Sequence, residues 1–262
     1  MEDDAVLVRE AVAGDLPAFT AIFSRYEAQV HDFALALLRD RKAAWEVVNA
    51  TFAEASERLE ELREPHRLIV WLLAIARFEA GLVDGAAAGL DREPALPDDD
   101  PERARLAGLV WEAVADLPLR ERALLDLHLR HGLDGGDLAD ALGVTPAEGD
   151  DLRRRMTGLE NGLAGFLVVR KADGRCPDLP LVLRGWDGRF TLPVADGIAA
   201  HVAVCRVCEQ SRRALPAPFT LYASAGQAPL PGPDVTAVTD APAPPEVVAA
   251  SDNPAAADEE PA

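Results

Sequence analysis

The sequence predicts an all-α fold: two small helical domains joined by a flexible linker, a third small helical domain and a disordered tail. Three observations lead to this prediction. Leucines recur at helical spacing through residues 117–156, with glycines where helices would end. Prolines and aspartates dominate residues 89–104. The chain after residue 214 is rich in proline, alanine and acidic residues and contains no lysine or arginine.

Residues 117–156 are typical of a helix-turn-helix preceded by one further helix. A leucine stripe ends at Gly132, a second helix is expected from Asp134, and Gly143 begins a tight turn. Thr145 is then a suitable N-cap for the third helix, with a proline at its first position. The pattern favours a nucleic acid as partner, although an ordinary three-helix bundle fits the same signals.

The expected third helix carries cations and acids on adjacent turns. Arg153, Arg154 and Arg155 would point outward toward phosphate or base edges. Asp150 and Asp151 would repel phosphate there, or would form ion pairs with the arginines four residues further on. The apolar face of this helix is expected to consist of Leu152, Met156, Leu159 and Leu163.

The N-terminal part of the chain carries a second pattern. Its parts are DLPAFTAIFSRY from Asp15 to Tyr26, the LALLRDRKAA turn from Leu35 to Ala44, Phe52, and the VWLLAIAR helix from Val70 to Arg77. In order and spacing they resemble region 2 of an extracytoplasmic-function sigma factor of bacterial RNA polymerase. Residues 117 to about 163 resemble region 4 of the same family, so the resemblance covers more than half of the chain.

The resemblance implies core RNA polymerase as a partner. In the family, an acidic face on one helix of region 2 docks on the polymerase clamp helices. This chain keeps only part of that face, and the residues in the same register are Trp45, Glu46, Asn49 and Phe52. Trp45 would be either an aromatic anchor at that interface or a partly buried core residue.

The resemblance also implies promoter DNA as a partner. The candidate DNA-binding residues are Arg63, Arg67, Arg77, Arg120, Arg122, Arg153, Arg154 and Arg155. In the family, a row of cations follows the VWLLAIAR helix, whereas this chain continues with FEAGLVDG. Because phosphate binding depends on such cations, the remaining arginines of region 2 would be residual DNA contacts or part of a solvated helix face.

The chain has a formal net charge of −19 at pH 7. DNA-binding domains usually carry a basic excess, so this acidity argues against the DNA-binding prediction. It does not remove that prediction, because sigma factors meet DNA together with polymerase, which supplies much of the cationic channel. In the family the linker threads this channel, where Asp98 to Asp100 would mimic nucleic-acid charge or form only a solvated connection.

All three cysteines lie in the third expected domain. His201, Cys205 and Cys208 follow the spacing i, i+4, i+7, which places them on one face of a helix. With Cys176 they form a set suited to a tetrahedral zinc site, with three unrelated buried cysteines as the alternative. The arrangement resembles the zinc-binding anti-sigma domain, which packs against region 2. It implies either a regulator acting in cis or a purely structural zinc site.

The expected domain boundaries follow from these patterns. They are residues 1–88 for region 2, 89–104 for the acidic linker, 105–170 for region 4, 171–214 for the zinc-binding domain and 215–262 for the disordered tail. Within the tail, the FTLY patch from Phe219 to Tyr222 would dock on a folded domain or have no role.

The sequence predicts a sigma-factor-like transcription initiation protein rather than an enzyme. It contains no phosphate-cradling glycine loop and no nucleophile elbow. No apolar run is long enough to cross a bilayer, which predicts a cytoplasmic protein with reduced thiols and no membrane partner. The alternative function is a degenerate, sigma-derived adaptor or anti-sigma-like regulator that binds polymerase or another sigma factor and does not recognise a promoter.

Overall fold

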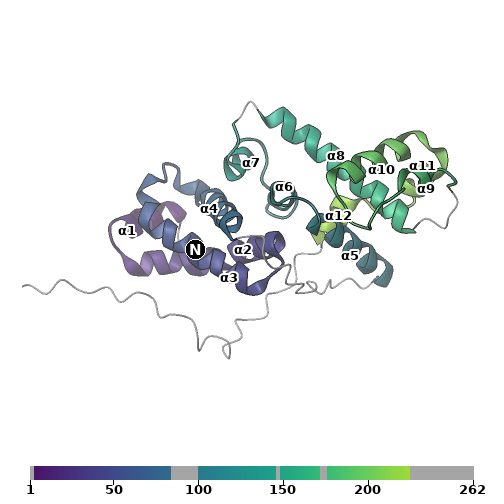
Figure 1. The fold of residues 1–262 in the computed structure, drawn as a ribbon. Helices are drawn as coiled ribbons and strands as arrows, with labels where there is room; N and C mark the ends of the chain where they lie inside the picture. The colour runs from purple at the N-terminus through teal and green to yellow at the C-terminus, as the bar shows by residue number, and fades with distance from the viewer. Residues whose placement is uncertain (1–2, 84–99, 146–147, 172–175, 225–262) are drawn as a thin grey trace, which may run out of the picture. The chain divides into compact units, whose positions relative to one another are not determined.

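The computed structural model describes residues 3–83, 100–145, 148–171 and 176–224. Every regular element within these ranges is a helix, and no strand occurs in them (Figure 1). This confirms the all-α fold class predicted from the sequence. None of the helices in the described ranges combines the length and the apolar character needed to span a bilayer.

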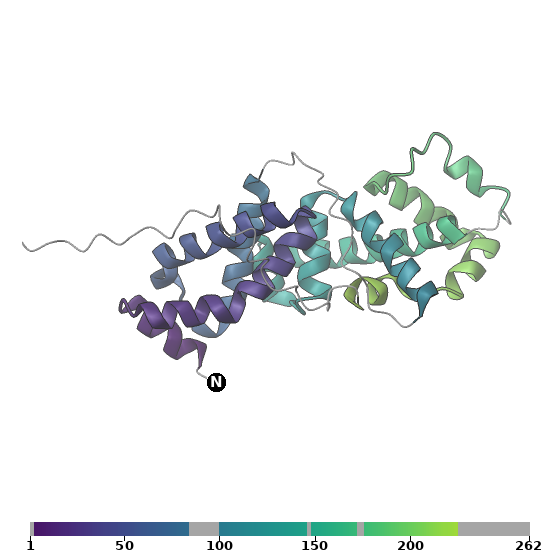
Figure 2. The ribbon, with the colours of Figure 1, turned by 90° about the horizontal axis from the view of Figure 1, so that it is seen from below.

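The N-terminal helices pack side by side in both views of the chain (Figure 1 and Figure 2). The predicted turn at residues 35–44 is confirmed. Arg39 ends α2 with a φ of +56°, and the Asp40 carboxylate caps α3 by accepting a hydrogen bond from the Ala43 amide at 2.8 Å. The elements are α1 (Asp4–Val12), α2 (Leu16–Leu38), α3 (Arg41–Arg58), η1 (Leu59–Glu61), η2 (Pro65–Arg67) and α4 (Leu68–Leu82).

Four helices follow, and the first of them corrects the predicted linker. Residues 101–104 belong to the first turn of α5 rather than to a flexible connection. The Asp100 carboxylate accepts hydrogen bonds from the amides of Glu102 and Arg103, which fixes the start of the helix. Residues 89–99 of the predicted linker lie outside the described residues. The four helices are α5 (Pro101–Ala115), α6 (Leu119–Leu129), α7 (Gly135–Leu142) and α8 (Gly149–Lys171).

The turn between α7 and α8 follows the sequence prediction. Asp134 occupies the N-cap position of α7, and the helix ends at Gly143, whose φ of +64° favours glycine. The amide and the hydroxyl of Thr145 donate to the Glu148 carboxylate at 2.7 and 2.9 Å. Pro146, expected at the first helical position, lies outside the described residues. The predicted apolar face of α8 is confirmed, with Leu152, Leu159 and Leu163 buried and Met156 half-buried.

The third group of helices consists of α9 (Leu179–Val182), α10 (Leu192–Val204) and α11 (Arg206–Arg213). Its longest member, α10, packs closely along α8 because two glycines of α8 face it. A Cβ atom at Gly162 would lie 2.7 Å from the Cβ atom of Ala195, and one at Gly165 would lie 2.5 Å from Cγ2 of Ile198. The observed packing therefore requires residues without a side chain at both positions.

The last described helix, α12 (Pro218–Ser224), corrects the predicted boundary of the disordered tail. The Tyr222 ring stacks on Trp111 of α5 with centroids 4.4 Å apart, and its hydroxyl donates a hydrogen bond to Asp126 of α6 at 3.0 Å. These two contacts hold the FTLY patch on the folded chain, as one of the two sequence alternatives expected. Residues 225–262 of the predicted tail lie outside the described residues.

Replacing Gly162 with alanine tests the packing of α10 on α8. The added methyl group would meet Ala195, whose Cβ atom moves only with its backbone, so we expect the free energy of unfolding to fall by about 1–3 kcal/mol. Urea denaturation measures this change. Gly158→Ala on the same helix is the matched control, since nothing lies within 4 Å of its Cβ position and alanine favours the helix. Equal effects of the two substitutions would contradict the packing.

Candidate metal centre and nucleic-acid interface

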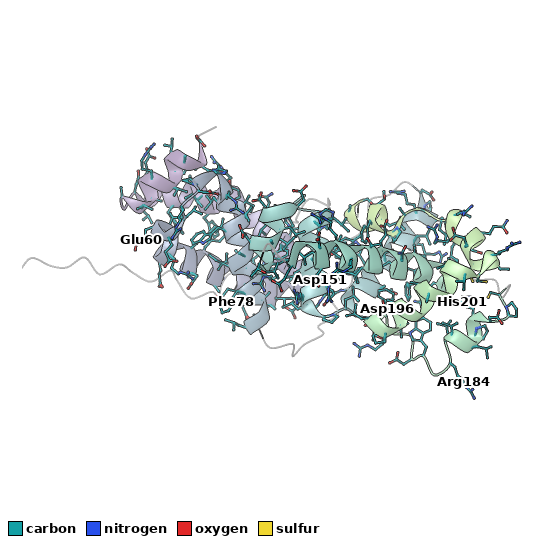
Figure 3. All side chains as sticks on the ribbon, turned by 90° about the horizontal axis from the view of Figure 1, so that it is seen from above. Glu60, Phe78, Asp151, Arg184, Asp196 and His201 are labelled. Atoms are coloured by element: carbon teal, nitrogen blue, oxygen red, sulfur yellow. The ribbon has the colours of Figure 1, made fainter. Side chains whose placement is uncertain are left out.

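Three thiols and one imidazole come together in the third group of helices. Cys176 precedes α9, His201 lies in α10 (Figure 3), Cys205 lies between α10 and α11, and Cys208 lies in α11. Their ligand atoms all lie within 4.8 Å of one another. We call these four residues the thiol–imidazole cluster.

The separations within the cluster suit a tetrahedral metal site. The Cys176 sulfur lies 3.3 Å from Nε2 of His201 and 3.8 Å from the Cys205 sulfur, and the Cys208 sulfur lies 3.4 Å from the same Nε2. Tetrahedral bonds of zinc to sulfur and nitrogen place neighbouring ligand atoms about 3.5–3.8 Å apart. The cluster could therefore hold a metal ion, and its donor set suits zinc.

The prediction that His201, Cys205 and Cys208 share one helix was wrong. The backbone leaves the helical region at Cys205, where φ is −92° and ψ is 114°, so this residue ends α10 and caps α11. The break keeps its hydrogen bonds: the Cys205 amide donates to the His201 carbonyl, and the Cys205 carbonyl accepts from the Glu209 amide, both at 2.9 Å. A bend, rather than a shared helix face, brings the three ligand atoms together.

The thiols of the cluster differ in their environments. A hydrogen bond from the Cys208 amide lowers the pKa of Cys205, whereas burial and the neighbouring thiols raise the pKa of Cys208 to about 12. Cys208 is therefore protonated at neutral pH unless a metal ion displaces its proton. Apolar side chains surround the cluster and limit the access of water, namely Val168, Leu179, Ile198 and Val202.

We expect the purified chain to contain about one zinc ion per molecule, because three thiols and one imidazole form a closed tetrahedral set. Cys208→Ala should abolish this zinc content, as measured by atomic emission spectrometry. His66→Ala should leave it unchanged, since His66 is exposed in η2 and does not belong to the cluster. Zinc content should fall at low pH because protons compete for the thiolates. The same zinc content in both variants would contradict the site.

Two predicted DNA-binding residues, Arg153 and Arg154, lie exposed near the N-terminal end of α8. They pair with Asp150 and Asp151, respectively, at a spacing of three residues (Asp151 is labelled in Figure 3). The predicted spacing of four occurs between Asp151 and Arg155, at 4.0 Å, but not between Asp150 and Arg154. Ion pairs between exposed groups are weak, so the guanidinium groups of Arg153 and Arg154 remain accessible to phosphate.

Arg155 differs from its two neighbours because it faces the protein. Its guanidinium pairs at 2.5 Å with Glu121 of α6, a residue only 4% exposed. A buried carboxylate needs such a partner, because an unpaired charge in the interior is costly. Arg155 therefore joins α8 to α6 in this structure.

Three further arginines predicted to bind DNA also contact protein groups. Arg67 pairs with two carboxylates of α7, Arg77 donates from Nε to a carbonyl of α7 at 2.9 Å, and Arg122 of α6 donates to a carbonyl of α2. Burial lowers the pKa of Arg77 and of Arg122. These three contacts connect the N-terminal helices with α6 and α7. The remaining two predicted arginines, Arg63 and Arg120, are exposed.

Of the predicted polymerase-binding residues on α3, the two aromatic ones are packed in the protein and the two polar ones are exposed. Phe52 is 4% exposed and packs edge-on against Phe23, with centroids 4.7 Å apart, and Trp45 is half-buried against His31 at 4.5 Å. Both aromatic residues therefore contribute to the core, which agrees with the alternative expected for Trp45. Glu46 and Asn49 are exposed.

A buried polar network is centred on Asp126 and was not predicted from the sequence. Arg130 pairs with Asp126 at 2.7 Å, and Nε2 of His131 lies 3.3 Å from the same carboxylate. Burial by itself would raise the pKa of Asp126, but Arg130 and His131 outweigh it and hold the pKa below its usual value. The spacing of four residues between Asp126 and Arg130 was the only local signal of this network.

No family model matches the chain. Over 176 residues the chain is 29% identical to the probable RNA polymerase sigma factor RfaY of Xanthomonas campestris pv. campestris. The chain is thus similar to a sigma factor. The match covers 59% of this chain and 42% of the relative, so the chain spans less than half the length of that protein. This similarity supports the sigma-factor-like relationship that the sequence patterns indicated.

Proposed function

We propose that the chain is a sigma-factor-like transcription initiation protein of the extracytoplasmic-function group. In this proposal it binds core RNA polymerase, directs it to promoter DNA and has no enzymatic activity. The observation that carries the proposal is the α7–α8 unit, which exposes Arg153 and Arg154 in a chain similar to a probable sigma factor. The second helix of a helix-turn-helix enters the major groove, and α8 is that helix here.

The exposed members of the two predicted residue sets contact the two proposed partners. Glu46 and Asn49 on α3 contact polymerase, while Trp45 and Phe52 pack α3 onto the core. The cations that contact DNA are the exposed ones, namely Arg63, Arg120, Arg153 and Arg154. This division follows from exposure, because a phosphate reaches a guanidinium group only where solvent does.

In this proposal the thiol–imidazole cluster holds zinc and, through α10, stabilises the position of α8. The anti-sigma resemblance implies packing against region 2, whereas the most extensive helix contact of α10 is with α8. A regulatory effect of the zinc domain in cis would therefore act through the position of α8. The alternative partner in this proposal is an anti-sigma protein acting in trans.

A second function is supported by a separate observation. Arg67, Arg77 and Arg122 are engaged with protein groups, and Asp150 and Asp151 stand beside the exposed arginines of α8. A chain whose predicted DNA-binding arginines are partly engaged in this way fits a sigma-derived adaptor that binds polymerase and does not read a promoter.

Run-off transcription on fragmented genomic DNA separates the two functions. With core polymerase and the full chain, we expect 5′ ends that share one pair of upstream elements. Arg153→Ala together with Arg154→Ala should reduce these starts roughly tenfold or more, because each lost phosphate or base contact weakens DNA binding. Polymerase binding, measured by co-sedimentation, should not change.

The matched control is Arg9→Ala together with Arg184→Ala, which removes two exposed arginines from α1 and from the segment after α9. This variant should transcribe like the unmodified chain. Stable polymerase binding without specific starts would replace the initiation function with the adaptor function. Absence of polymerase binding would refute both.

A further inference from the structure

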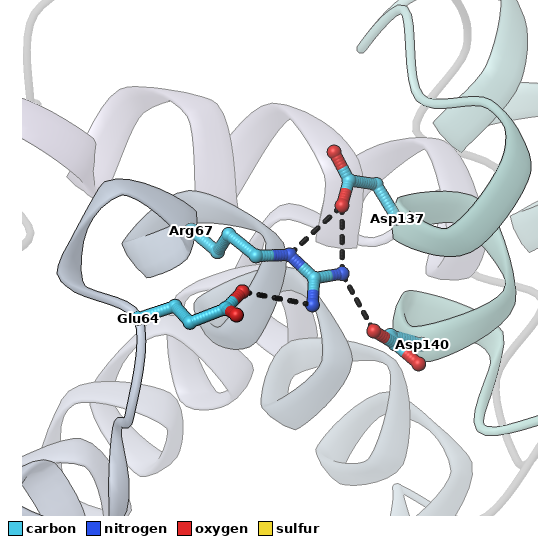
Figure 4. A network of polar contacts seen from close by, with 4 residues as sticks. All are labelled: Glu64, Arg67, Asp137 and Asp140. Atoms are coloured by element: carbon cyan, nitrogen blue, oxygen red, sulfur yellow. Dashed lines mark hydrogen bonds and ion pairs between the residues drawn. The ribbon is translucent and has the colours of Figure 1, made fainter.

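Carboxylates from α7 and from the residue before η2 bind the Arg67 guanidinium group (Figure 4). Its Nη2 atom lies 2.6 Å from Asp137 and 2.5 Å from Asp140, its Nε atom donates to Asp137 at 2.8 Å, and Nη1 lies 3.5 Å from Glu64. Asp137 and Asp140 are one helical turn apart on α7, so both point at the same guanidinium group. We call these four residues the Arg67 latch.

A second arginine of the N-terminal helices also contacts α7. Arg77 of α4 donates to the Ala141 carbonyl, near the C-terminal end of α7. Its Nη2 atom would also lie 2.9 Å from a Cβ atom at Gly143, so the guanidinium fits against the turn that follows α7. Two arginines on the N-terminal side thus hold successive turns of one helix.

The chemistry of the latch matches that of a phosphate contact. A guanidinium group binds carboxylates and phosphates with the same fork of N–H donors. Asp137 and Asp140 present an arc of anionic oxygens to Arg67, as the backbone of a nucleic acid would. The two carboxylates belong to α7, the first helix of the unit proposed to bind DNA.

We propose that Asp137 and Asp140 imitate a nucleic-acid backbone and occupy the Arg67 site in the free chain, so that nucleic acid and α7 compete for the same guanidinium group. This inference rests on the proposed function and adds a regulatory step to it. Opening of the latch makes Arg67 available to phosphate and releases α7 from Arg67.

Exposure allows such an exchange. The Arg67 side chain is 27% exposed, and those of Asp137 and Asp140 are 49% and 54% exposed. Ion pairs at this degree of exposure are weak and are screened by salt, so a polyanion displaces them without unfolding the chain. These ion pairs therefore cover Arg67 reversibly and do not belong to the buried core.

Asp137→Asn combined with Asp140→Asn tests the latch. The isosteric amides keep the shape of α7 and remove both charges from Arg67. In fluorescence anisotropy with short labelled DNA, single-stranded and double-stranded, of mixed sequence, we expect the full chain to bind about fivefold tighter, the change that ~1 kcal/mol produces. Hydrogen exchange at residues 135–142 should also become faster.

Two further variants isolate the cause. Glu60→Gln with Asp196→Asn removes the same charge at exposed residues outside the latch (both labelled in Figure 3) and should not increase affinity. In the background of Arg67→Gln, the two α7 substitutions should bring no gain. A similar gain in that background, or no gain with the latch residues neutralised, would overturn the proposal.

The readouts keep this inference separate from the proposed function. The competition is measured on the chain without polymerase, whereas promoter-directed initiation is measured by specific starts with polymerase. Specific starts that are equally strong with and without the latch carboxylates, together with unchanged DNA affinity, would refute the latch and leave the initiation function standing. A gain in DNA affinity without any specific start would support the latch and refute the initiation function.

Discussion

The buried carboxylate of Asp126 is the constraint on which the arrangement of the helices depends. It is fully shielded from solvent, so it requires donors and counter-charges within the protein. Arg130 and His131 supply them from the end of α6, and Tyr222 supplies a hydrogen bond from α12. Arg130 also pairs with Asp32 of α2. One acid therefore fixes segments distant in sequence, and the loss of Arg130 would leave its charge uncompensated in the core.

The position of α6 determines how the chain uses its cations. Helix α6 packs against α2 and α7 packs against α4, and the arginines at this interface contact carbonyls and carboxylates. Each guanidinium group engaged in this way contributes to helix packing and does not bind phosphate while the contact lasts. In a chain with a net charge of −19, the proposed DNA binding would therefore depend on a partner that supplies positive charge.

Local features of the structure could be predicted from the sequence, and long-range ones could not. The helix end at Gly143 and the turn within residues 35–44 depend on residues within a few positions, and both predictions were correct. The four members of the thiol–imidazole cluster were found because their chemistry is distinctive. The backbone conformation of the cluster was not predicted, since ligands at i, i+4 and i+7 fit either one helix or the bend at Cys205. The contact of Arg67 could not be predicted for another reason: Asp137 lies 70 residues away, beyond any periodic signal.

Helix α8 connects the two candidate sites, because it is continuous from Gly149 to Lys171. Its N-terminal part exposes Arg153 and Arg154, and its C-terminal part packs through Gly162 on α10. A metal ion held by the thiol–imidazole cluster would fix the end of α10 and the start of α11, and Val168 of α8 belongs to the same apolar cluster as Cys176 and Cys208. Loss of the metal would loosen α10 first, since small metal-bound units depend on the ion for their fold. A rigid helix transmits such a change along its axis, so a metal ion bound at the cluster would affect the arginines of α8 through packing and not through charge.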